Sequence, residues 1–167
     1  MARRTKTRWL DEDEQRTWRS FLFAVRLLGE QLDRELQRDA GMPHAYYEIL
    51  VALSEAPDRT LRMSRLAELT RSSRSRLSHA IDRLEELGWV SRCPLPTDKR
   101  GAMARLTDTG FKTLEGAAPG HVAAVRQHLL DKLTPEQVAQ LGEISTAILE
   151  GFTTPECPGE GDRSALT

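Results

Sequence analysis

Residues 71–106 read RSSRSRLSHAIDRLEELGWVSRCPLPTDKRGAMARL, and this stretch determines the fold. Its first half has the spacing of an amphipathic helix, because apolar residues recur at steps of three and four at Leu77, Ile81 and Leu84. Ser72 or Ser73 can cap the start of this helix, and Gly88 suits the position just past its end. The sequence therefore predicts a helix over about residues 73–87.

The second half of the stretch has a different period. Residues 89–93 and 102–106 alternate between polar and apolar side chains, which is typical of strands. The intervening residues 94–101 hold two prolines, a glycine and the basic pair Lys99 and Arg100, a composition that favours a turn. We therefore expect a β-hairpin with a long, basic tip.

A short helix precedes this stretch. Ser64 can cap it, Leu66 and Leu69 give it an apolar side, and the hydroxyl-rich residues 70–73 predict a turn after it. Residues 59–63 suit an extended bridge leading into it. Two helices joined by a tight turn form a helix-turn-helix, and a hairpin directly after them predicts the winged helix-turn-helix fold.

Helices are also predicted on the N-terminal side. Residues 11–38 form one long helix that ends at Gly41-Met42-Pro43, and the next helix ends at Ala56-Pro57-Asp58. The long helix has a single apolar stripe, made of Trp18, Phe21, Leu22, Val25, Leu28, Leu32 and Leu36.

On the C-terminal side a long helix is predicted from about residue 107 to 133, with a kink or break near Pro119. Thr134-Pro135-Glu136 predicts the start of a last helix, which runs to Phe152, and residues 153–167 are expected to form a flexible tail. The expected fold class is mainly α, with a small β-hairpin wing and a helical dimerisation region.

Composition excludes several classes of protein. The 167 residues, 39% hydrophobic and 29% charged, fit one folded domain, and no apolar run reaches the roughly 20 residues of a membrane span. The basic N-terminus lacks the apolar segment of an export signal. Cys93 and Cys157 stand far apart, which excludes a disulfide framework or a zinc knuckle within the chain and disfavours a thiol switch. A cytoplasmic protein without cofactor or metal is expected.

Charge is unevenly distributed although the net charge is only −1. Basic residues outnumber acidic ones in residues 1–8 and 71–105, whereas acidic residues dominate in 9–70 and 106–167. The predicted helix carries polar and basic residues in its first turns and acids later, which suits a helix whose N-terminal end meets DNA. The candidate DNA-binding residues are Ser73, Arg74, Ser75, Arg76, Ser78, His79, Arg83, Lys99 and Arg100.

Two arginines have distinct expected roles. Arg76 can form a bidentate contact with guanine, and Arg83 either contacts phosphate or pairs with Glu86 or Asp82. At the hairpin tip, Asp98 can hold the loop and orient Arg100 toward a narrow minor groove.

The chain resembles the multiple antibiotic resistance regulator (MarR) family over residues 11–152. The resemblance lies in Leu66-Ala67, Ser75-x-Leu77-Ser78-x-x-Ile81-Asp82-Arg83-Leu84-Glu85-x-x-Gly88-Trp89-Val90, Asp98-Lys99-Arg100-Gly101 and Leu106-Thr107-x-x-Gly110. It implies a homodimeric bacterial transcription regulator, usually a repressor, that binds a pseudo-palindromic duplex. By this resemblance residues 11–38 and 107–152 form the dimerisation region and 43–106 form the winged helix-turn-helix. The charge distribution predicts a basic arm over residues 1–10, which either adds phosphate contacts or is disordered. Many relatives have another residue in place of His79, so base preference does not transfer.

The resemblance also implies that a small aromatic or anionic effector releases the DNA. Trp18, Tyr46 and Tyr47 are the candidate effector-binding residues, and packing in the core is the competing interpretation. An enzyme is not expected, because the four histidines lack metal-ligand spacing and no nucleophile or phosphate-binding motif is present. The alternative is a helical protein-interaction module with only non-specific affinity for DNA.

Overall fold

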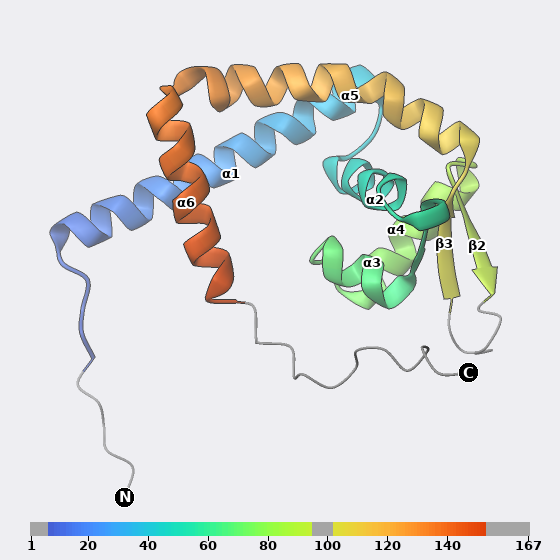
Figure 1. Ribbon diagram of the computed structural model, residues 1–167, viewed down its shortest axis with the longest axis horizontal. Coiled ribbons are helices and arrows are strands. Elements are labelled where there is room, and N and C mark those ends of the chain that lie inside the picture. Colours follow the sequence, from blue (N-terminus) through green and yellow to red (C-terminus); the bar gives the residue numbers. More distant parts are fainter. Residues whose placement is uncertain (1–6, 95–101, 153–167) are drawn as a thin grey trace, which may run out of the picture. The chain divides into compact units, whose positions relative to one another are not determined.

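The computed structural model describes residues 7–94 and 102–152, and the chain divides into two compact units that meet between His128 and Leu129. Figure 1 shows the elements of the first unit, and its helices are α1 Glu12–Ala40, α2 His44–Ser54, α3 Met63–Leu69, α4 Arg74–Glu86 and α5 Asp108–His128. Its other elements are the 3-10 turn η1 Pro57–Arg59 and the strands β1 Thr60–Arg62, β2 Val90–Pro94 and β3 Ala102–Leu106. The predicted fold class, mainly α with a small β wing, is confirmed.

Helix α1 has the signals expected of its ends. The Asp11 carboxylate accepts from the Glu14 amide at 2.8 Å, while the Glu14 side chain accepts from the Asp11 amide, which satisfies two backbone donors at the helix start. Gly41, at φ 64°, ends the helix in the left-handed conformation that glycine adopts without strain. The helix predicted for residues 11–38 is therefore confirmed with its ends shifted by one and two residues.

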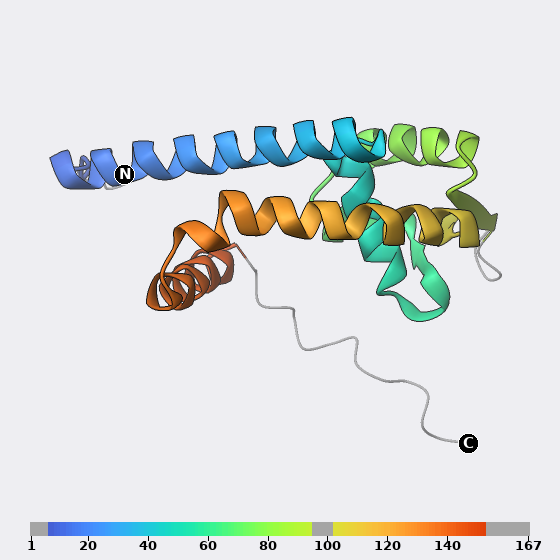
Figure 2. The ribbon, with the colours of Figure 1, turned by 90° about the horizontal axis from the view of Figure 1, so that it is seen from above.

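Helices α1 and α5 lie side by side (Figures 1 and 2). Leu32 and Leu36 are buried on α1, and Ala117 and Ala124 are buried on α5. His128 Nε2 lies 2.8 Å from the Glu35 carboxylate, which also accepts from the Gln31 amide at 2.6 Å. These hydrogen bonds lower the pKa of Glu35 below its ordinary value. Because Glu35 lies on α1 and His128 lies on α5, the contact between them also joins the two helices.

Helix α5 runs through Pro119 as one helix, so of the predicted kink or break the break is wrong. Proline removes only one helical hydrogen bond, and Pro119 faces solvent while the helix is held on either side by its contacts with α1. The helix ends at His128, five residues before the predicted Leu133, and a 3-10 turn follows.

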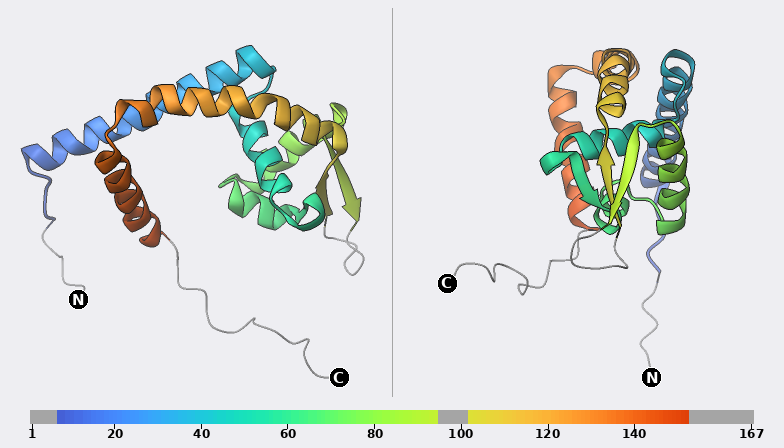
Figure 3. Two further views of the ribbon diagram at one scale, coloured as in Figure 1. Left: turned by 45° about the horizontal axis from the view of Figure 1, so that its top comes forward. Right: turned by 90° about the vertical axis from the view of Figure 1, so that its right-hand side faces the viewer.

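The winged helix-turn-helix supplies most of one apolar core, which Leu36 of α1 and Leu114 and Ala117 of α5 also join. Its members from α2, α3, α4 and the sheet include Ile49, Leu50, Leu53, Leu66, Leu77, Ile81, Leu84, Val90, Ala104 and Leu106. The sheet has the order β1-β3-β2 and is antiparallel throughout. The bridge predicted over 59–63 thus becomes an edge strand, since Leu61 pairs with Ala104. Figure 3 shows α4 beside the hairpin of β2 and β3.

Two serines predicted as helix caps differ in outcome. Ser73 caps α4, because its hydroxyl accepts from the Arg76 amide at 3.3 Å. Ser64 does not cap α3, which begins one residue earlier after Arg62 and has no side-chain cap. Arg62 belongs to β1, so α3 follows the strand directly and Ser64 is already helical. That prediction is wrong because the strand pairing sets the start of the helix.

The second unit contains η2 Leu130–Lys132 and α6 Pro135–Glu150. The Thr134 hydroxyl accepts from the Gln137 amide at 3.3 Å, and the Gln137 side chain accepts from the Thr134 amide at 2.9 Å. The predicted start of the last helix is therefore confirmed. Among residues 7–94 and 102–152, no helix combines the length and apolar character needed to cross a membrane.

Candidate nucleic-acid interface

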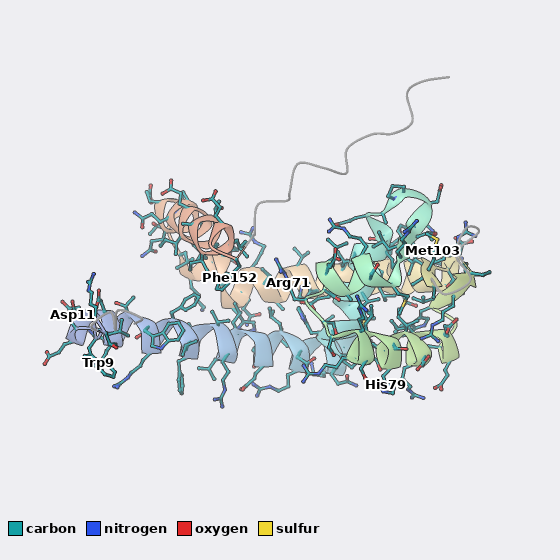
Figure 4. The ribbon with its side chains drawn as sticks, turned by 90° about the horizontal axis from the view of Figure 1, so that it is seen from below. Trp9, Asp11, Arg71, His79, Met103 and Phe152 are labelled. Carbon is teal, nitrogen blue, oxygen red and sulfur yellow. The ribbon has the colours of Figure 1, made fainter. Side chains whose placement is uncertain are left out.

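Helix α4 has one buried side and one exposed side. Leu77, Ile81 and Leu84 are buried, while Arg74, Ser75, Arg76 and His79 are exposed in the first two turns. Figure 4 shows His79 on the side of α4 that is turned away from α3 and from the Met103 strand. Within the described residues neither Arg74 nor Arg76 forms an ion pair, so both guanidinium groups are available to an anion.

The acids of α4 are all paired. Arg83 forms an ion pair with Glu86 on the same helix, which is one of the two roles predicted for Arg83. Asp82 pairs with Arg92 of β2 at 2.5 Å, and Glu85 pairs with the same guanidinium at 3.0 Å. The three carboxylates share two cations, which leaves one negative charge over, and Arg74 and Arg76 on the same helix outweigh it.

Arg92 is the main residue at this site that the sequence analysis missed. Its guanidinium donates to the Ser78 carbonyl at 3.2 Å and to the Ser78 hydroxyl at 3.3 Å, in addition to its two carboxylate contacts. The signal was present: acids at 82 and 85 share one flank of the helix, and an arginine follows on the returning strand. Ser78, predicted as a DNA contact, is half-buried beside this arginine.

The hairpin brings together the two ends of the predicted wing tip. Pro94 pairs with Ala102, so residues 95–101 connect neighbouring strand ends. The predicted wing residues Asp98, Lys99 and Arg100 fall in that segment and lie outside the described residues. The exposed Ser73 and the free side of α4 belong to the same winged unit as this hairpin.

Gly110 connects the wing to α5 at a point of close approach. The Thr107 hydroxyl donates to the Gly88 carbonyl at 2.7 Å and accepts from the Gly110 amide at 3.0 Å. A Cβ atom on Gly110 would lie 2.1 Å from the Trp89 carbonyl oxygen. The Leu106-Thr107-x-x-Gly110 motif therefore holds the corner between α4 and β2 against the start of α5.

A cavity of about 650 Å³ lies beside α2, the end of α3 and α5. Three aromatic rings line it: the Tyr47 ring centroid is 4.4 Å from that of His121, which is 5.3 Å from that of His44. Arg65 and Arg71 add positive charge to the lining, and Glu48 and Glu55 add negative charge. Of the three predicted effector-binding residues, the structure brings only Tyr47 to this cavity; Tyr46 packs against the core, and Trp18 is exposed on α1.

One polar atom of this cavity lacks a partner. Among the described residues, only His121 has a buried side-chain nitrogen or oxygen, Nδ1, that forms no hydrogen bond. Burial lowers the pKa of the His121 imidazole, and the neighbouring His44 lowers it further. A neutral His121 therefore presents an unsatisfied polar atom beside an aromatic wall.

Comparison with known proteins agrees with this geometry. The sequence model of the MarR family matches residues 40–101. The crystal structure of Sco3205, a MarR family transcriptional regulator from Streptomyces coelicolor in complex with DNA, is 54% identical, covers 92% of this chain and 97% of that one, and has a TM-score of 0.86. AbsC, a MarR family regulator from the same organism, is 44% identical over 87% of this chain and 98% of its own, with a TM-score of 0.82.

The curated relatives match a shorter stretch. The transcriptional repressor YetL of Bacillus subtilis is 30% identical over 107 residues, which is 62% of this chain and 64% of YetL. The multiple antibiotic resistance protein MarR of Salmonella typhimurium is 36% identical over 73 residues, 44% of this chain and 51% of that protein. The chain thus spans between half and two thirds of these two relatives. From the family match and the two Streptomyces structures, the chain belongs to the MarR family of transcriptional regulators.

Proposed function

We propose that the protein is a homodimeric repressor that binds a pseudo-palindromic operator in double-stranded DNA. The observation that carries this proposal is the exposed N-terminal half of α4, where Arg74 and Arg76 lack ion-pair partners within the described residues. It is supported by the 54% identity to a regulator crystallised on DNA. Being a member of a family of transcriptional regulators, the chain agrees with the prediction of a regulator rather than an enzyme.

The proposed recognition uses two parts of the winged unit, residues 43–106. Helix α4 enters the major groove, where Arg76 forms a bidentate contact with guanine and Ser75 and His79 contact base edges or phosphates. Lys99 and Arg100 of the wing reach the adjacent minor groove, with Arg100 oriented by Asp98. The basic arm of residues 1–10 adds phosphate contacts.

Dimerisation is proposed for residues 11–38 and 107–152. Exposed apolar side chains support it on α1, where Trp18, Phe21, Leu22 and Val25 are between 43% and 54% exposed. The same holds for α6 and the residues after it, where Ile144, Ile148, Leu149 and Phe152 are between 43% and 73% exposed. Exposed aromatic and aliphatic side chains gathered on one helix, as on α1 and on α6, are typical of a subunit interface. Two paired subunits would place their α4 helices in successive major grooves, with half-sites about 10 base pairs apart.

Release by a small aromatic or anionic effector is the regulatory part of the proposal. The cavity beside α2 supports it, because aromatic walls with a few polar groups suit such ligands. Arg71 lines that cavity and lies in the turn between α3 and α4 with φ at 49°. An anion held by Arg71 would therefore act directly on the residue that leads into the recognition helix. We place this regulator in the cytoplasm, where it has access to DNA.

A competition titration tests the proposal. The purified protein is titrated against a labelled duplex from the DNA just upstream of its own gene, with an unrelated duplex as competitor, at several salt concentrations. Tight binding that survives the competitor is expected, because base contacts distinguish the two duplexes. Affinity that falls equally for both duplexes as salt rises would contradict the proposal and would favour the alternative of a protein-interaction module with only non-specific affinity.

A further inference from the structure

We infer that Arg92 is a positioning residue for DNA recognition, which fixes the strand leading into the wing to the flank of the recognition helix. The inference rests on the proposed function and extends it to a residue that does not face the duplex. Arg92 would act by making α4 and the hairpin move as one body, so that both meet the DNA in one fixed arrangement.

The contacts of Arg92 reach three successive turns of α4. One guanidinium nitrogen donates to Asp82 Oδ1 at 2.5 Å and to Glu85 Oε2 at 3.0 Å. The other donates to the carbonyl and the hydroxyl of Ser78 at 3.2 and 3.3 Å. The backbone amide of Arg92 adds a bond of 2.6 Å to Glu85 Oε1. A planar guanidinium that satisfies several acceptors at once fixes both the distance and the direction between strand and helix.

These contacts lie where they leave the DNA-facing surface free. Ser78, Asp82 and Glu85 share the flank between the buried stripe of α4 and its exposed face. The Arg92 side chain is 32% exposed, and so is that of Glu85, so water competes only partly for the pair. The clamp, meaning Arg92 with Ser78, Asp82 and Glu85, is therefore partly shielded from water and does not involve Ser75 or His79.

The rest of the junction leaves this alignment less defined. At the turn itself hydrogen bonds to backbone carbonyls set the alignment, because the Trp89 amide donates to the Leu84 carbonyl at 2.9 Å and the Thr107 hydroxyl donates to the Gly88 carbonyl at 2.7 Å. Beyond the turn, helix α4 and β2 are joined by apolar packing around Ile81 and Val90, which is not directional. The hydrogen bonds of Arg92 extend the directional constraint along α4 to Asp82 and Ser78.

Arg92 also changes the charge that the duplex would meet. Asp82 is 48% exposed and Glu85 32%, and Arg92 is the cation that the structure places beside both. Without it two carboxylates on the recognition helix would repel DNA phosphates. A lysine in its place could neutralise one acid but could not also reach Ser78 with a planar fork.

A double-mutant cycle separates positioning from simple stability. Operator and unrelated-duplex affinities are measured for the wild type, Arg92→Gln, Arg100→Ala and the double variant, together with the thermal unfolding midpoint of each. We expect Arg92→Gln to lower operator affinity about tenfold, to change unrelated-duplex affinity about twofold or less, and to lose much less when Arg100 is already absent. Arg105→Gln, at an exposed position on the neighbouring strand β3, is the matched control.

The outcomes separate a failure of the positioning role from a failure of the proposed function. Losses that multiply in the double variant, or that are equal on both duplexes, would overturn the positioning role. Wild-type affinity for Arg92→Lys would overturn it as well, since that variant keeps only the charge. If Arg92→Gln fails to fold, Glu85→Gln gives the same test, because it keeps an acceptor for the Arg92 amide but weakens the guanidinium contact. If the wild-type protein shows no preference for the operator, the proposed function itself fails.

Discussion

The apolar side chains of the winged helix-turn-helix and those of the N-terminal half of α1 differ in their exposure to solvent. Leu50, Leu77 and Ile81 of the winged unit are at most 1% exposed. On α1, by contrast, Phe21 is 43% exposed and Trp18 is 51% exposed, although they lie on the same stripe as the buried Leu36. The winged unit completes its core within one chain, whereas the apolar surface of α1 requires a partner to leave water.

The largest expected effect comes from a charge in the middle of the exposed stripe. Phe21→Glu would place a carboxylate in the proposed dimer interface, and an unpaired buried charge is strongly unfavourable. We expect a monomer whose operator affinity falls by about 1,000-fold, to the level of non-specific binding. Sedimentation velocity and the operator titration measure the two effects. Gln37→Glu, at an exposed site on the same helix, should remain dimeric; a dimeric Phe21→Glu protein would remove this surface from the account.

A second variant tests the junction between the wing and α5. Gly110→Ala would force its Cβ against the Trp89 carbonyl, 2.1 Å away, and should cost about 3 kcal/mol of unfolding free energy. Gly116→Ala in the same helix has open space around it and should stabilise the protein by about 1 kcal/mol. Denaturant unfolding measures both. A tolerated Gly110→Ala would show that the junction is not as tight as its contacts indicate.

The contrast between these regions also explains what the sequence could predict. The start and end of α4 depend on Ser73 and Gly88, which are local signals, and the helix follows the expected bounds within a residue. The edge strand β1 and the start of α3 depend on pairing with β3, a strand that lies some forty positions farther along the chain. The local spacing of residues does not indicate such pairing, and the prediction that Ser64 caps α3 was therefore wrong.

The site shows the same division. The exposed face of α4 follows from helical periodicity alone, because the positions opposite Leu77 and Ile81 must face solvent. The clamp through Arg92 and the gathering of His44, Tyr47 and His121 join residues from different elements. Tyr47 was predicted for a ligand site without its histidine neighbours, since α5 brings His121 there only in the folded chain.

Within the winged unit, Arg76→Ala tests whether Arg76 contacts a base, as proposed, or a phosphate. Loss of a bidentate guanine contact should cost about 1–3 kcal/mol of binding free energy and relax the preference at one base pair. Binding to a panel of operator duplexes with single base-pair changes measures both effects. An equal loss on every duplex would instead identify Arg76 as a phosphate contact.

Arg100→Ala should have a smaller and more uniform effect. A wing arginine in the minor groove contributes mainly through charge and groove width, so binding should weaken on all sequences alike, or only at an A·T tract. The salt dependence of operator binding should also become less steep by about one phosphate contact. Unchanged affinity on every duplex would remove the wing from the mechanism.

The smallest expected effect is on the pH dependence of stability, through His121 beside the cavity. The pKa of His121 is lowered in the folded protein, so the unfolded chain binds the proton more readily. His121 therefore favours folding above its unfolded pKa of about 6.5, and this contribution falls as the pH drops below that value. Thermal unfolding between pH 7.5 and 5 should show a shallower pH dependence for His121→Gln than for the wild type. The exposed His79→Gln should retain the wild-type slope; equal slopes for all three proteins would contradict the burial of His121.

The central claim is that two copies of this chain read one operator. Footprinting of the upstream duplex, with the protein-to-duplex ratio determined by sedimentation of the same complex, tests it most directly. We expect two protected half-sites about 10 base pairs apart, centre to centre, and two chains for each duplex. A single protected half-site with one bound chain would contradict it.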